Sequence, residues 1–153
     1  MDFKQLWSLA GLCLRHPLYV TPTYTATRKT VKICDQKFGK AHHKNGRANA
    51  FRHALWNVLI IHRCKRWSSM TRAAAWAKCI TDWHEDFSIN KPLARAMDLH
   101  NNHVGRTFAM QHKEASESQL IQLVMVLIPL SRKRTSIEQM QEHPDTLTHI
   151  EDD

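Results

Sequence analysis

The amino-acid sequence predicts an all-α fold, a compact bundle of five to six helices with a polar site between the three central ones. Its 153 residues are enough for one domain with its own hydrophobic core. Only four glycines and five prolines interrupt the chain, and apolar residues recur every three or four positions, as on one face of a helix. We therefore expect a single helical domain over residues 1–135, with its motifs between residues 40 and 110.

The first two helices are predicted from a shared apolar face and from their ends. A helix over residues 2–15 carries five apolar side chains on one face: Phe3, Leu6, Trp7, Ala10 and Leu14. Pro17 ends it, because the residue before a proline avoids helical geometry. Thr21 is a suitable N-cap with Pro22 at the first helical position, so a second helix is expected from there to about residue 38.

Four further helices follow a basic loop at residues 39–47. Serine N-caps, a proline at a helix start and the apolar period place them at about residues 48–66, 69–87, 92–112 and from 116 onward. The last of these is broken near Pro129. Residues 136–141 add one or two turns before a disordered end.

Charge is distributed unevenly along the chain. The net charge is +8, but no Lys or Arg follows Thr135, whereas six acidic residues do. The first 135 residues therefore carry a net +14, which attracts anions such as phosphate esters, anionic lipid headgroups or nucleic acid. Such a positive excess also serves solubility alone. Residues 136–153 are expected to form an acidic, flexible tail that shields the basic surface.

Cysteine usage and hydropathy indicate the compartment. Cys13, Cys34, Cys64 and Cys79 lack CxxC spacing, which argues against a structural zinc site and favours reduced thiols in the core of a cytoplasmic protein. No apolar stretch is long enough to span a bilayer, and the first residues lack the features of a signal peptide. We expect a soluble protein, with peripheral membrane contact left open.

Several common site types are not supported. The chain has no glycine-rich phosphate-binding string and no GxSxG motif. Its basic patches lack interleaved stacking aromatics, so nucleic-acid binding is not favoured. His42 and His43 are expected in the solvated basic loop.

Three of the predicted helices carry a polar stripe flanked by apolar residues. Helical spacing groups Asn49, Arg52, His53, Trp56 and Asn57 on the first, Thr81, His84 and Glu85 on the second, and Asp98, Asn101, Asn102 and Arg106 on the third. Because buried polar groups need hydrogen-bond partners, we expect the three stripes to face one another. The side-chain polar groups of His53, Glu85 and Asp98 should then lie within about 8 Å of one another.

The same helices carry three sequence blocks: residues 49–56 (NAFRHALW), His84-Glu85, and residues 97–106 (MDLHNNHVGR). In this order the blocks resemble an uncharacterised bacterial domain family. That family includes small stand-alone proteins and terminal modules of polymorphic toxins. The resemblance covers about residues 40–110. The toxin context of the family implies a hydrolase.

The predicted polar cluster supports two catalytic interpretations. In the first, a divalent metal, zinc, manganese or iron, is bound by mixed nitrogen and oxygen ligands: His53, His84, Glu85 and Asp98. Adjacent residues diverge by roughly a third of a turn, so only one of His84 and Glu85 is expected to ligate directly. In the second, Glu85 and His53 perform acid-base chemistry without a metal, while Arg52 or Arg106 holds an anionic oxygen.

Two interpretations without catalysis also stand. The cluster could bind a phosphorylated ligand or a lipid headgroup, or it could be a polar network that holds the helix crossings together. Our leading hypothesis is a hydrolase of a phosphoester or lipid-like anionic substrate with His53, His84, Glu85 and Asp98 at its catalytic core. The substrate-positioning residues would be Asn49, Arg52, Asn57, Asn101, Asn102 and Arg106. The alternative is a non-catalytic helical domain that binds an anionic ligand or partner.

Overall fold

The computed structural model describes residues 3–152 and confirms the all-α prediction. Its helices are α1 (Phe3–Arg15), α2 (Pro17–Phe38), α3 (Arg47–Cys64), α4 (Met70–Asp86), α5 (Pro92–Gln111), α6 (Glu117–Val126) and α7 (Ile137–Gln141). Two 3₁₀ helices, η1 (Ala41–His43) and η2 (Ile128–Leu130), and two short strands, β1 (Arg132–Lys133) and β2 (Thr148–His149), complete the described part of the chain. None of the helices within it combines the length and apolarity that a bilayer crossing requires.

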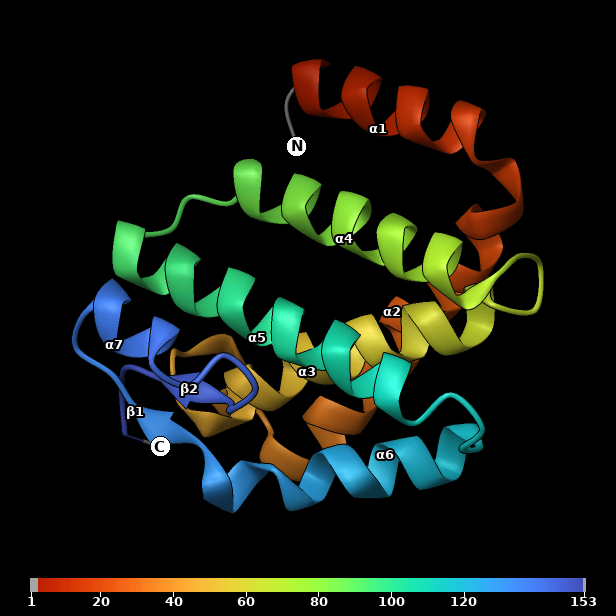
Figure 1. The fold of residues 1–153 in the computed structure, drawn as a ribbon. Helices are drawn as coiled ribbons and strands as arrows, with labels where there is room; N and C mark the ends of the chain where they lie inside the picture. The colour runs from red at the N-terminus through yellow and green to blue at the C-terminus, as the bar shows by residue number, and fades with distance from the viewer. Residues whose placement is uncertain (1–2, 153) are drawn as a thin grey trace.

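The central element is α3, which packs against α2, α4, α5 and α6 (Figure 1). Thirteen of its 18 residues are buried. Its apolar residues are not confined to one stripe, as expected for a helix that is covered on most of its circumference. Each polar side chain on α3 that faces a neighbouring helix must therefore find a partner on that helix.

α3 and α5 cross at Gly105 of α5 with their backbones nearly in contact. A Cβ atom at Gly105 would lie 2.4 Å from the carbonyl oxygen of Ala54 and 2.7 Å from its Cα. Only glycine allows two helices to approach this closely. This crossing brings the polar side chains of α3 and α5 within hydrogen-bonding reach of one another.

The start of α2 differs from the sequence prediction. The helix begins at Pro17 and continues through Pro22, whereas the sequence analysis placed its first turn at Thr21-Pro22. Pro17 occupies a first-turn position, where its missing N–H has no intrahelical acceptor in any case. The prediction of a helix start at residue 21 was therefore wrong.

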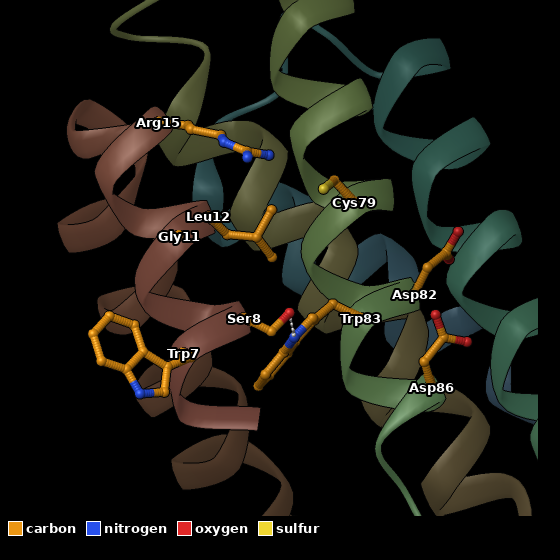
Figure 2. Close-up of a pocket in the computed structure, with 9 residues that line it drawn as sticks. All are labelled: Trp7, Ser8, Gly11, Leu12, Arg15, Cys79, Asp82, Trp83 and Asp86. Carbon is orange, nitrogen blue, oxygen red and sulfur yellow. Dashed lines mark hydrogen bonds between the residues drawn. The ribbon is translucent and has the colours of Figure 1, made fainter. Parts of the chain in front are cut away.

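The four cysteines are not all in the core. Cys34 and Cys64 are buried, Cys13 is half-buried and Cys79 is exposed. Cys79 lines an open groove of about 510 Å³ between α1 and α4 (Figure 2). The prediction of four core thiols was wrong for Cys79, because α1 and α4 do not close over this face of α4.

The C-terminal segment, predicted to be a flexible acidic tail from residue 136, packs into the domain up to β2. Leu147, Thr148 and His149 are buried, and β2 pairs in parallel with β1. The side-chain amide of Asn101 makes two hydrogen bonds to the Thr148 backbone: Nδ2 donates to the Thr148 carbonyl oxygen and Oδ1 accepts from the Thr148 N–H, each with a nitrogen-to-oxygen distance of 2.9 Å. The acidic composition of the segment gave no sign of these few buried residues, which hold the segment against the domain.

Candidate functional site

The three polar stripes converge between α3, α4 and α5. Nδ1 of His53 lies 3.5 Å from Oε1 of Glu85, and Nε2 lies 3.2 Å from Oδ1 of Asp98. None of the three side chains is more than 5% exposed. One ligand atom from each lies within 4.8 Å of the others. The predicted convergence of His53, Glu85 and Asp98 is therefore confirmed.

A chain of amides holds His53 from one side. Oδ1 of Asn102 is 3.2 Å from Nδ1 of His53 and accepts a hydrogen bond of 2.8 Å from Nδ2 of Asn57. Oδ1 of Asn57 in turn accepts from the hydroxyl of Thr81 at 3.3 Å and from the guanidinium of Arg106 at 3.2 Å. Arg106 also donates to the hydroxyl of Thr81 at 3.4 Å, and the network fixes the orientation of the imidazole ring.

Arg52 determines which nitrogen of His53 carries the proton. Its guanidinium lies 2.9 Å from Nε2, and a guanidinium can only donate, so Nε2 is an acceptor and Nδ1–H donates to Asn102. Burial lowers the pKa of His53 well below its ordinary value. The positive charge of Arg52 lowers it further, and the hydrogen bond to Asn102 opposes the change. The imidazole is therefore neutral at pH 7.

Three of the four oxygens of the two carboxyl groups lack a hydrogen-bond donor in the described chain. Both oxygens of Glu85 and Oδ1 of Asp98 are buried, and none has a partner in hydrogen-bonding geometry among the described residues. Oδ2 of Asp98 accepts a bond of 3.1 Å from Asn90. Burial raises the pKa of Glu85 to about 7, with the charge of Asp98 adding to the rise, and burial also raises the pKa of Asp98 to about 7.

His84 and Asn101 do not join the cluster, although the sequence analysis named both as site residues. His84 is exposed, and its ring meets the edge of Trp56 at 5.3 Å between centroids. Its neighbour Glu85 takes the inward position, because successive residues on a helix point about 100° apart. Asn101 and Asn102 are adjacent on α5, so their side chains point in different directions. Asn102 faces His53, whereas Asn101 faces Thr148 of β2.

Asn49 remains a candidate at the edge of this cluster. It is buried one turn before His53 on α3, and its Oδ1 atom has no partner in hydrogen-bonding geometry in the described chain. An unsatisfied buried amide oxygen is unusual in a native fold and is typical of a site that accommodates a ligand or an ordered water.

The sequence analysis overlooked one contributor to the site and misplaced a histidine outside it. Asn90, in the loop before α5, binds Asp98, but a loop residue belongs to no helical stripe and gives no periodic signal. His42, expected in a solvated loop, is fully buried within η1, and its Nε2 atom lies 2.9 Å from Oδ1 of Asp35. That expectation was wrong because η1 packs against α2 and α3.

The raised pKa of Glu85 predicts how the metal-free protein responds to pH. The folded-state pKa of about 7 exceeds the ordinary 4.5, so the protonated acid stabilises the fold at low pH, and this contribution is lost as the pH rises through 7. Glu85→Gln cannot ionise. In the presence of EDTA its melting temperature relative to wild type should increase by roughly 3 °C, or about 1 kcal/mol, between pH 6 and pH 8.

Thermal unfolding of both proteins in matched buffers measures this difference. Groups that titrate identically in the two proteins cancel in the comparison. A constant difference across this range would contradict a buried Glu85 that ionises near neutral pH.

The comparisons with known proteins identify a protein family. A family model described as Domain of unknown function (DUF6973) matches residues 10–131. Neither the curated proteins nor the solved structures give a match to this chain. The matched span contains α2 to α6 and every side chain of the site between α3, α4 and α5.

Proposed function

The chain belongs to the family of the domain of unknown function DUF6973, and we propose that its members use this site to bind a divalent metal and hydrolyse an anionic ester. The ligands are His53, Glu85 and Asp98. Zinc and manganese are the ions that best suit one imidazole and two carboxylates. The substrate class is a phosphoester or a lipid-like anionic ester.

One observation carries the proposal: three buried carboxylate oxygens, which have no partner in hydrogen-bonding geometry in the described chain, lie around a neutral imidazole. Buried anionic oxygens without partners destabilise a fold by several kcal/mol each. A network that only held the helices together would supply donors to these oxygens, as Asn57 does for Asn102. A divalent cation would satisfy all three oxygens at once.

Three protein ligands suit a catalytic metal better than a structural one. Structural zinc sites are usually closed by four side chains, whereas catalytic sites keep a position for water or substrate. A bound ion would lower the pKa of a water in that position and so supply a nucleophile at neutral pH. Ordinary acid-base catalysis by Glu85 and His53 would use the same two groups, but would leave the carboxylate oxygens without a cation.

Arg52 is the residue best placed to bind the substrate anion. Its guanidinium donates to Nε2 of His53, the nitrogen that also faces Asp98. A metal on this nitrogen would take the place of the guanidinium, which would then be free to bind a phosphate or carboxylate oxygen. The net charge of +8 on the chain favours the approach of such substrates.

Metal content and turnover test the proposal together. Protein purified without added ions should contain close to one equivalent of zinc or manganese by mass spectrometry. Phosphomonoester, phosphodiester and carboxylic ester substrates should be hydrolysed by the metal-loaded protein, and EDTA should abolish the activity. His103→Asn, at an exposed position of α5, is the matched control and should retain both metal and activity.

Two results would contradict the proposal in different ways. Metal binding without hydrolysis of any of these esters would favour the alternative, a non-catalytic domain that binds an anionic ligand. Absence of metal from the wild-type protein, even after incubation with zinc and manganese, would exclude the metal centre itself.

A further inference from the structure

α1 has two faces with different surroundings. One face is attached to α4: the indole of Trp83 donates to the hydroxyl of Ser8 at 3.0 Å, and Leu12 packs against the hydrophobic core. Figure 2 shows Ser8 and Leu12 directed toward α4 and Trp7 directed away from it. Figure 1 shows α1 on the outer side of α4, at the periphery of the bundle.

The outward face of α1 is the apolar face that the sequence identified. Its four large side chains are Phe3, Leu6, Trp7 and Leu14, which are 77%, 53%, 65% and 82% exposed. At about 100° per residue they occupy roughly 100° of the helix circumference, nearly opposite Ser8 and Leu12. An amphipathic helix in a globular protein normally turns such a face to the core. Here nothing in the described chain covers it.

The charges of α1 indicate which kind of partner suits its apolar face. The helix contains no acidic residue, and exposed lysine and arginine side chains lie near its two ends, at Lys4 and Arg15. Helices that lie in the interface of anionic membranes combine tryptophan, phenylalanine and leucine on one face with cations elsewhere on the helix. On α1, Lys4 is exposed, and Arg15 lines the groove toward α4. The overall net charge of +8 adds long-range attraction to the same surface.

A second copy of the chain fits this face less well. In a symmetric dimer built on α1, two chains that each carry a net charge of +8 would approach each other, with no acidic residue on either copy of α1 to compensate the repulsion. An anionic lipid surface offers the complementary charge together with an apolar layer for the four side chains.

We propose that α1 docks the protein on an anionic phospholipid membrane. The helix lies in the plane of the interface with Phe3, Leu6, Trp7 and Leu14 inserted among the lipids, and α2 to α7 remain in water. The proposal rests on α1 alone and is independent of the metal centre between α3, α4 and α5.

Vesicle sedimentation tests this docking with a matched pair of double variants. Trp7→Gln with Leu14→Gln removes two side chains of the apolar face. Trp67→Gln with Ile89→Gln removes two comparably exposed apolar side chains elsewhere. Wild type should bind vesicles of phosphatidylserine and phosphatidylcholine mixed at about 1:3, and the first variant should bind about tenfold or more weakly. The control variant should bind like wild type.

Salt and lipid composition supply the second arm. Binding should weaken on pure phosphatidylcholine vesicles and when the salt is raised from about 0.05 to 0.5 M, since screening shortens the range of the attraction. Failure of the wild type to bind the anionic vesicles, or equal binding by the Trp7/Leu14 variant, would overturn the proposal. A concentration-dependent dimer in analytical ultracentrifugation that this variant abolishes would also overturn it and assign the face to a second copy. Metal content, measured on the same samples, should not change.

Discussion

Glu85→Gln should lose the metal while folding as well as the wild type or better. The substitution keeps the shape of the side chain but removes a buried charge whose two oxygens have no donors in the described chain. At pH 7.5 we expect the melting temperature to be unchanged or a few degrees higher, because the uncompensated charge is gone. Metal affinity should fall by at least about 100-fold, since even residues behind the ligands contribute 10- to 100-fold. Calorimetric titration and thermal unfolding measure the two effects.

His53→Asn and Asp98→Asn should behave alike, with metal lost and the fold retained. His53→Asn also removes the hydrogen bond to Asn102, so a loss of about 1 to 3 kcal/mol in stability is compatible with this expectation. Collapse of all three variants, with no metal ever detected in the wild type, would contradict the metal centre. The polar stripes would then serve only to hold α3, α4 and α5 together.

Gly105→Ala should destabilise the protein by about 3 kcal/mol, or roughly 10 °C in melting temperature. The added methyl group would lie 2.4 Å from the carbonyl oxygen of Ala54, and backbone atoms cannot move aside as a flexible side chain can. α5 must therefore shift away from α3, which carries Asp98 and Asn102 away from His53. Metal affinity should fall together with stability, unlike in Glu85→Gln.

Gly11→Ala is the matched control for this prediction. A Cβ at Gly11 of α1 meets nothing within 4 Å. Replacing a helical glycine by alanine in open space should stabilise the protein by about 0.5 to 1 kcal/mol. If Gly105→Ala unfolded at the same temperature as the wild type in a denaturation series, the close crossing of α3 and α5 would be wrong.

The helices and the meeting of the polar stripes could be predicted from the sequence because both follow from local periodicity and from the need of buried polar groups for partners. Which of two adjacent polar residues faces the site could not be predicted. Glu85 rather than His84, and Asn102 rather than Asn101, face His53. That choice depends on which elements pack against each face of the helix. For α5, β2 covers the face that carries Asn101. β2 is a strand of two residues in a segment whose acidic composition predicted a flexible tail.

The burial of the apolar face of α1 could not be predicted from the sequence either. The 3.6-residue period identifies Phe3, Trp7 and Leu14 as one face, and the structure confirms that they share it. Periodicity identifies an apolar face, but whether that face is buried depends on which other element or molecule packs against it, and the local sequence does not show this.

The clamp between Asn101 and Thr148 has a consequence for how the chain is made. The two residues are 47 positions apart, so a nascent chain that has reached the end of α5 does not yet contain the backbone group that the Asn101 amide requires. Until then α5 presents a polar side chain that native packing would bury without a partner, a penalty of about 1 to 3 kcal/mol against a total stability of only about 5 to 15 kcal/mol. A product of premature termination that ends before Thr148 keeps this penalty permanently. Such chains would spend more time unfolded and would be the first to reach cellular proteases. Synthesis must therefore reach Thr148 before α5 gains its full stability.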